Sequence, residues 1–171
     1  AIAPDHFRAE AIDVGQGTAV LIRTANHALL YDTGASFADS DSGERIIVPY
    51  LRAAGIGRLS GLVISHDDND HSGGMRSVLR DISTGWLLHG LPANSPLLDG
   101  APPARQCARG QRWNWDGVQF EILNPLPPAY AESRRRDAAR LVQIAQVDQE
   151  RLPEQGTQPI ELEGAELIRL G

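Results

Sequence analysis

The sequence predicts a mixed α/β fold, and three observations support this prediction. Short apolar strands lie on both sides of the turn at Gly15-Gln16-Gly17, and a third strand follows the next turn. A buried strand at 62–65 is followed by apolar residues at helical spacing over about 73–82 and by a strand at about 85–89. Further along, Asp116-Gly117 joins two alternating runs as a tight hairpin does.

The first part of the chain gives a β-meander and a helix. Apolar residues over 46–54 share one helical face, and Gly55 ends that helix. Pro49 should kink the helix or mark its real start, because a proline inside a helix removes a backbone hydrogen bond. The three strands of the meander are predicted over 7–13, 18–24 and 28–32.

The later part gives fewer clear elements. Runs at 111–115 and 118–123 form the predicted hairpin. Leu141, Ile144 and Ala145 are spaced as a helical stripe, and 160–170 has the pattern of a short hairpin. A length of 171 residues predicts one domain that spans the whole chain.

Four metal-competent side chains follow the buried strand within six residues, at a strand end where α/β folds present ligand groups. They are His66, Asp68, Asp70 and His71. Imidazole nitrogen and carboxylate oxygen together suit zinc, manganese or iron. Three carboxylates in four positions would repel one another unless a cation lay among them. We therefore predict a metal site, with Gly73-Gly74 letting the backbone pass close to the cation.

Two other interpretations of this stretch stay open. The run 68–73 fits the opening of a calcium loop, but Leu79 would then stand where such a loop needs a bidentate glutamate. The stretch also fits a solvated acidic turn in which Asp70 or Ser72 caps a helix. That second interpretation accounts for one carboxylate, but not for two histidines that flank a run of aspartates.

The same residues resemble a known family. The pattern His66-x-Asp68-x-Asp70-His71 followed by two glycines resembles the metal motif of the metallo-β-lactamase superfamily, with aspartate in place of the usual second histidine. Other segments resemble the C-terminal hydrolase domain of ComEC-type DNA-uptake channel proteins, and the resemblance is clearest over 7–130, with 131–171 atypical. These segments are DVGQGTA at 13–19, YDTG at 31–34, VPYLRAAGI at 48–56 and 107–123 with its WNWDGVQF run.

The resemblance implies a fold and a site. The fold is the αββα sandwich of that superfamily, either whole or as its first half followed by an atypical C-terminal segment. Two divalent cations, zinc or manganese, would be held by His66 with Asp68 and by Asp70 with His71. Asp70 would also act catalytically by orienting the attacking water. Asp32 would orient a ligand from behind, unless it is a turn aspartate that bonds its own backbone.

The resemblance also implies a function and a setting. The implied activity is phosphodiester hydrolysis of DNA during uptake, directed at the strand that is not taken up. The implied partners are single-stranded DNA as substrate and the membrane channel of the same bacterial parent protein. The implied location is a soluble domain outside the cytoplasm, attached to an inner-membrane protein.

The later metal ligands of the superfamily do not appear in the sequence. A Thr-Gly-Asp strand end and a His-His-Gly-Ser segment are both absent, and no histidine follows His89. His27, His89 and Asp116 are better explained by a hairpin, a strand end and a turn. Three hypotheses therefore stay open: a DNA nuclease, a hydrolase of small esters, thioesters or lactams, and a catalytically incomplete fragment or binding module.

Composition limits these hypotheses without deciding between them. The net charge of −6 argues against a generally basic nucleic-acid surface, so a contact with DNA must be local, with Arg134-Arg135-Arg136 and Arg140 as the best candidate. The single Cys107 excludes an internal disulfide. Trp113 and Trp115 share a strand face and are expected to pack on the core. Neither a membrane-spanning run nor a signal peptide is expected from the sequence.

Overall fold

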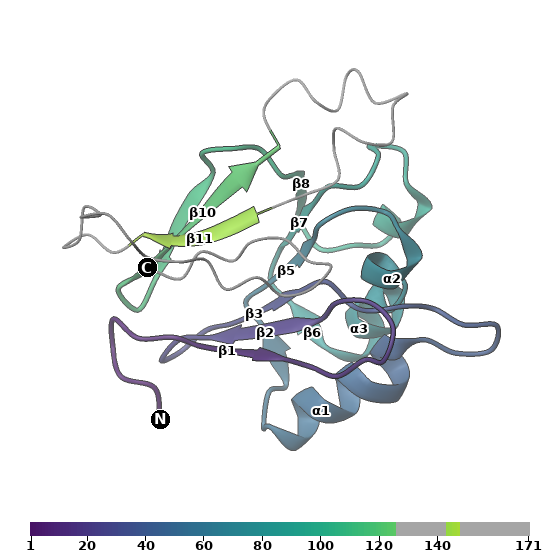
Figure 1. Cartoon of the computed structure of the whole chain (residues 1–171), viewed down its shortest axis with the longest axis horizontal. Helices are drawn as coiled ribbons and strands as arrows, with labels where there is room; N and C mark the ends of the chain where they lie inside the picture. The colour runs from purple at the N-terminus through teal and green to yellow at the C-terminus, as the bar shows by residue number, and fades with distance from the viewer. Residues whose placement is uncertain (126–142, 148–171) are drawn as a thin grey trace.

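The structure, a computed structural model, describes residues 1–125 and the strand at 143–147 (Figure 1). Its larger sheet consists of β1 (Arg8–Ala11), β2 (Val20–Arg23), β3 (Ala28–Tyr31), β5 (Gly61–Ile64), β7 (Leu87–His89) and β8 (Ala104–Gln106). The strands lie in that order across the sheet. The first three are antiparallel and the last four run parallel to one another, so the predicted meander and the mixed α/β order are confirmed.

Helices connect the parallel strands. A π-helical turn, η1 (Gly43–Ile47), leads directly into α1 (Val48–Ala53), and Pro49 lies in the first turn of α1. A proline there loses no helical hydrogen bond, so it marks the start of that helix. The helix predicted over 73–82 is α3 (Met75–Asp81), and a short helix, α2 (Asn69–Ser72), precedes it. No helix in the described part of the chain has the length and apolar character needed to cross a bilayer.

The helices cover one face of the larger sheet because side chains alternate along its strands. Leu30 and Leu62 point to the helical face, where they join a buried cluster with residues of η1, α1 and α3. The cluster members from these helices are Ile47, Val48, Leu51, Met75 and Val78, and Ile82 directly follows α3. Two short strands, β4 (Arg58–Leu59) and β6 (Ser83–Thr84), pair with each other, and a 3₁₀ turn, η2 (Pro96–Leu98), lies between β7 and β8.

A second sheet packs on the opposite face. Its strands lie in the order β11 (Gln143–Val147), β10 (Val118–Asn124) and β9 (Arg112–Trp115). Tyr31 and Val63 of the larger sheet form a buried cluster with Val118, Phe120 and Ile122. The tryptophans of β9 are half-buried against this cluster, as predicted, and Trp113 stacks on Phe120 with ring centroids 5.1 Å apart. Helices, larger sheet and smaller sheet thus form three layers (Figure 1).

The predicted hairpin between β9 and β10 is present. Asp116 and Gly117 both have positive φ, 54° and 90°, as a tight two-residue turn of this kind requires. The Asp116 carboxylate also reaches the β2–β3 turn, where it accepts hydrogen bonds from the Thr24 hydroxyl (2.5 Å) and from the backbone (2.7 Å) and side-chain amide (2.8 Å) of Asn26. This one carboxylate therefore ties the smaller sheet to the larger one.

The helical stripe predicted at Leu141, Ile144 and Ala145 is wrong over 143–147, which is strand β11. This strand pairs antiparallel with β10, whose other edge is bonded to β9. The backbone groups along that edge of β10 need partners, and satisfying them overrides a helical pattern of this kind. The predicted hairpin at 160–170 and the arginines at 134–136 and 140 lie outside the described residues.

Candidate metal centre

The carboxyl ends of β3 and β5 meet at one edge of the larger sheet, because these strands are parallel neighbours. Asp32 follows β3 there, and Ser65 follows β5. The N–H and the hydroxyl of Thr33 both donate to the carbonyl oxygen of His71, at 2.7 and 3.0 Å, and so hold α2 against this edge. The structure therefore brings α2 and its histidine together with Asp32 at this edge.

The buried Asp32 carboxylate organises both histidines. Its Oδ1 accepts from the backbone N–H of Ser65 and its Oδ2 from the Ser65 hydroxyl, each at 2.7 Å. Oδ2 also lies 2.7 Å from His71 Nδ1, and Ser65 Oγ lies 2.8 Å from His66 Nδ1. Since the Ser65 hydroxyl gives its proton to Asp32, it accepts from His66. Both Nδ1 atoms then carry the proton, and both Nε2 atoms have the form that ligates metals.

The two Nε2 atoms face the motif's carboxylates. His66 Nε2 lies 3.4 Å from Asp68 Oδ2, and His71 Nε2 lies 3.7 Å from Asp70 Oδ2. The ring centroids of the two histidines are 4.1 Å apart. Burial and then the neighbouring His71 lower the pKa of His66, against the opposing effect of the nearby carboxylates. A lowered pKa favours the neutral ring, which is the protonation state that metal binding requires.

The turn at Gly15-Gln16-Gly17 packs directly on the metal motif. The backbone N–H of Thr18 donates to the carbonyl oxygen of Asp70 at 3.0 Å. Gly17 has a φ of +100°, and a Cβ at this position would lie 1.8 Å from that same oxygen. Only glycine fits there, so the turn fixes the backbone of Asp70. Asp13 accepts from the N–H of Gly15 at 3.1 Å, which is turn chemistry rather than site lining.

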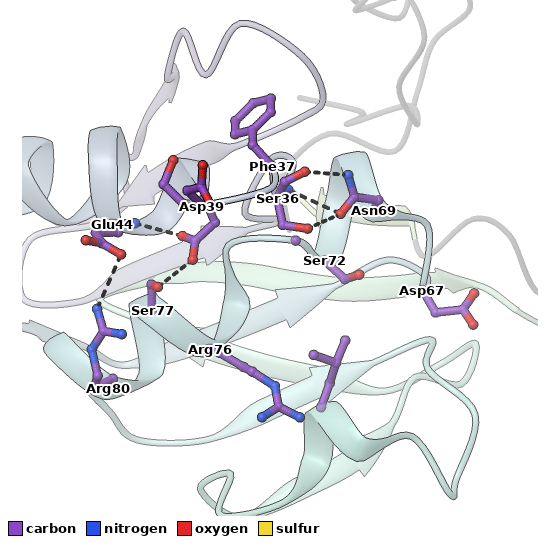
Figure 2. A pocket seen from close by; sticks show the side chains of 14 residues that line it. Ser36, Phe37, Asp39, Glu44, Asp67, Asn69, Ser72, Arg76, Ser77 and Arg80 are labelled. Carbon is purple, nitrogen blue, oxygen red and sulfur yellow. Dashed lines mark hydrogen bonds and ion pairs between the residues drawn. The ribbon is translucent and has the colours of Figure 1, made fainter.

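Residues next to the predicted ligands in the sequence face a different feature, a pocket of about 620 Å³ bordered by α3 (Figure 2). Asp67, Asn69 and Ser72 line it, and none of the predicted metal ligands does. The Asn69 amide is bonded three times to Ser36, accepting from its N–H (3.2 Å) and its hydroxyl and donating to its carbonyl (3.0 Å). Asn69 thus fixes the loop after β3, with its exposed Phe37, to the metal motif.

The structure gives the glycine pair of the motif a packing role. A Cβ on Gly73 would lie 2.1 Å from the backbone nitrogen of Ser36, and one on Gly74 would lie 2.4 Å from the carbonyl oxygen of Thr33. The close approach is therefore to the backbone of the loop after β3. Glycine at both positions lets the α2–α3 junction reach the sheet edge.

The two alternative interpretations of the motif are wrong. A calcium loop would run from 68 to 79, but residues 69–72 and 75–81 are helical. In the capping interpretation Asp70 or Ser72 would precede a helix, but both lie inside α2. Asp68 precedes that helix, and its side chain makes no capping hydrogen bond. The acidic residues of the motif therefore serve neither purpose.

The donor chemistry of the cluster fits a divalent cation, because two correctly oriented imidazoles and two carboxylates gather at one edge. Within residues 1–125 and 143–147, no group of three or more His, Cys, Asp or Glu side chains has the arrangement of a complete metal site. The residues present fit a metal in type and orientation, with fewer converging ligands than the three of a catalytic zinc site. The assignment of His66, Asp68, Asp70 and His71 as ligands stays a prediction.

The other candidate histidines lie at two different places in the larger sheet, His27 at the β2–β3 turn and His89 at the end of β7, the parallel neighbour of β5. His27 stacks on Trp115 with ring centroids 4.9 Å apart, and its Nδ1 lies 3.1 Å from Asp116 Oδ2. His89 ends β7 in the core, where burial lowers its pKa although a hydrogen bond with the Leu91 backbone opposes that shift. His27 thus contacts the β9–β10 hairpin and His89 lies at a strand end, and that neither binds a metal stays a prediction. Burial likewise raises the pKa of the Cys107 thiol.

Sequence reasoning missed three residues of the cluster. Ser65 links both histidines to Asp32, Thr33 holds α2, and Asn69 fixes the loop after β3. Ser65 had a usable signal, because a hydroxyl directly before a predicted ligand at a strand end is placed to orient it. The hydrogen-bond partners of Thr33 and Asn69 lie more than thirty residues away in the sequence, so a local sequence pattern could not predict these contacts.

Comparison with known proteins identifies the family. Residues 12–157 match the sequence profile of the metallo-beta-lactamase superfamily. The chain belongs to this superfamily. The solved structure of metallo-β-lactamase SMB-1 bound to 2-mercaptoethanesulfonate is similar to this metallo-β-lactamase domain, with a TM-score of 0.53, 18% identity and coverage of 75% of this chain and 56% of that one. MEM-A1, a subclass B3 metallo-β-lactamase from a soil metagenome library, is similar with a TM-score of 0.50 and 18% identity. The match covers 75% of this chain and 55% of MEM-A1. The predicted fold class is confirmed.

Bacterial relatives of the metallo-β-lactamase domain carry names that refer to competence or to recombination. "Competence protein ComA" of Neisseria gonorrhoeae is 50% identical over 113 residues, which are 66% of this chain and 15% of that protein. "Recombination protein 2" of Haemophilus influenzae is 38% identical over 119 residues, which are 70% of this chain and 14% of that protein. The domain thus spans only about a seventh of the length of these relatives. The predicted relationship to ComEC-type proteins is confirmed.

Proposed function

We propose that this metallo-β-lactamase domain is a divalent-metal-dependent hydrolase that cuts the phosphodiester bonds of DNA. The arrangement around Asp32 supports the metal dependence. The buried Asp32 carboxylate contacts His71 directly and His66 through the Ser65 hydroxyl, so both rings have the same tautomer and both Nε2 atoms lie near carboxylates. A shared acceptor behind two imidazoles is typical of metal ligands and is unusual in a surface turn.

The proposed roles follow from this geometry. His66 with Asp68 and Asp70 with His71 would hold two cations, zinc or manganese. Such a pair supplies an activated water and neutralises charge on a phosphodiester. Asp32 and Ser65 would hold both imidazoles in the orientation and tautomer that leave Nε2 able to bind a metal. Asp70 would accept a hydrogen bond from the attacking water and so orient it, while the contact of Thr18 and Gly17 with its carbonyl holds its backbone in place.

The proposed substrate is a DNA strand. The names of the relatives refer to competence and recombination, and their sequences extend well beyond this domain. We therefore include in the proposal that single-stranded DNA is cut during uptake, that the membrane channel of the same parent protein delivers it, and that the domain lies outside the cytoplasm of a bacterium.

A cleavage assay tests this proposal. The purified chain with manganese or zinc is incubated with end-labelled single-stranded and duplex oligonucleotides. We expect cleavage that is abolished by EDTA and by Asp70→Ala, and retained in Asp67→Ala, which removes an exposed carboxylate that is not a predicted ligand. Intact DNA together with turnover of a lactam or a thioester would instead support a hydrolase of small molecules.

A second candidate function, a catalytically incomplete binding module, is favoured by one observation. In the described residues no three ligating side chains converge as a full site. Calorimetric titration of the metal-free chain with manganese and zinc separates the two candidates. Tight binding of about two ions, lost in Asp70→Ala, supports the hydrolase. Weak binding that Asp70→Ala does not change supports the module.

A further inference from the structure

A second pocket, of about 630 Å³, lies at the end of the larger sheet opposite the metal motif. The β2–β3 turn at 24–27 and the segment 55–60 form its walls, and Arg8 of β1 completes it. Strand β3 begins at this pocket, at Ala28, and leads to Asp32 behind the metal motif. At about 3.3 Å per residue, these two points are about 13 Å apart along the strand.

Cationic side chains dominate the described lining of this pocket. Arg8, Arg23 and Arg58 all contribute, and no Asp or Glu is among the lining residues that the structure describes. Glu10, just outside, lies 3.0 Å from Arg8 and 2.8 Å from Arg23, so two guanidinium groups share one carboxylate. Arg58 makes no ion pair with any residue that the structure describes. In a chain with a net charge of −6, this is a local concentration of positive charge.

Arg23 presents a donor without an acceptor. Its side chain is 26% exposed, and one of its terminal nitrogens lies 2.8 Å from Glu10. Its Nε is buried and has no hydrogen-bond partner among the described residues. A buried N–H group is almost always paired, so the described residues do not satisfy all the donors of Arg23, whose side chain borders the pocket.

The wall of the pocket is held in position from outside. The Asp116 carboxylate accepts from the Thr24 hydroxyl and from the backbone and side chain of Asn26, and it lies 3.1 Å from His27 Nδ1. These bonds, led by that of Thr24, lower the pKa of Asp116. Its negative charge is therefore satisfied by the turn that it supports, and these bonds hold that turn in place at the pocket wall.

We propose that this arginine pocket binds phosphate groups. Guanidinium groups present paired N–H donors that match the oxygens of a phosphate ester, and three of them offset its charge. The phosphate can belong to a DNA strand or to a free nucleotide. Binding of a DNA strand rests on the proposed function, since one strand would then run from this pocket toward the metal motif. Binding of a free nucleotide does not depend on the proposed function.

Binding in the absence of metal tests this proposal. The probes are fluorescein-labelled oligo(dT), followed by fluorescence anisotropy in EDTA, and dTMP, followed by calorimetry. Arg8→Gln combined with Arg58→Gln removes two exposed guanidinium groups and leaves the core intact. We expect the double variant to bind the oligonucleotide about tenfold more weakly, with a slope of log K against log salt reduced by about 1.4, because each lost contact with a single strand contributes about 0.7.

A matched control and the second probe complete the test. Arg105→Gln removes an exposed arginine of β8 that lines neither pocket, and we expect unchanged binding. Loss confined to the oligonucleotide identifies a strand as the source, and equal loss of dTMP binding identifies a nucleotide. Wild-type affinity of the double variant for both probes, or no binding of either probe to the wild type, overturns the proposal.

The two proposals fail separately. If the chain cuts DNA and the double variant binds as tightly as the wild type, the proposed function is supported and the arginine pocket is overturned. If the chain binds DNA through Arg8 and Arg58 but does not cut it, the arginine pocket is supported and the proposed function is overturned. Circular dichroism and thermal melting of the double variant establish that it is folded before either conclusion is drawn.

Discussion

The Asp32 carboxylate lies 2.7 Å from Nδ1 of His71, although the two residues are 39 positions apart in the chain. Both are buried, and the same carboxylate oxygen accepts from the Ser65 hydroxyl. One acceptor at the end of β3 therefore sets the orientation of both imidazoles of the motif. The end of a central strand is a rigid place for such an acceptor, so the histidines are oriented before any ligand arrives.

Replacing Asp32 by asparagine should weaken metal binding. Asparagine has nearly the same shape and tolerates the φ of 58° found here, so the backbone should persist. An amide has one acceptor oxygen, and its NH₂ group would face either Ser65 or His71 in place of an acceptor. We expect affinity for manganese or zinc to fall by about 10- to 100-fold in calorimetric titration. Asp67→Asn is the control, and an unchanged affinity in folded Asp32→Asn would contradict this role.

Adding a methyl group at Gly17 should destabilise the fold more than adding one at Gly15. Both residues have positive φ, 100° and 76°, so both substitutions strain the backbone. A Cβ at Gly17 would also strike the carbonyl oxygen of Asp70, while a Cβ at Gly15 meets nothing within 4 Å. We expect Gly17→Ala to lower the free energy of unfolding by about 1–3 kcal/mol more than Gly15→Ala in urea titration. Equal effects would show that the turn does not press on the motif.

Removing the Asn69 amide should release the loop after β3. Three hydrogen bonds to Ser36 would be lost, each contributing about 0.5–1.5 kcal/mol. We expect Asn69→Ala to increase amide hydrogen exchange over residues 36–41 while the strands keep their protection. Asn94→Ala, at an exposed position without such bonds, is the matched control. Unchanged exchange in the loop would mean that the isolated bridge between Ser36 and Asp41 holds it instead.

Local pattern predicted the meander, the β5 strand and the hairpin at Asp116-Gly117 because each depends on alternation or on turn chemistry within a few residues. It also located the metal motif, since the ligand types are adjacent in the chain. It failed at 143–147, where pairing with β10 decides the structure. Ser65 was missed because its importance lies in two contacts, to Asp32 and His66, that only the folded sheet edge creates.

Stability should fall as the pH drops below about 6.5, and His89 should carry part of the effect. Burial lowers the pKa of this residue from its ordinary value of 6.5. Above pH 6.5 His89 is neutral in both states, so its contribution to stability is fully present. Below 6.5 the unfolded chain takes up a proton that the folded chain does not, and the free energy of unfolding falls until the folded pKa is reached.

Urea titrations of the metal-free chain between pH 8 and pH 5 measure this effect. A single such histidine contributes a slope of at most about 1.4 kcal/mol per pH unit, and His66, whose pKa is also lowered by burial, adds to it. We expect His89→Gln to be less stable at pH 8 but to lose less stability on acidification. An identical slope in His89→Gln and the wild type would show that His89 takes up its proton equally in both states.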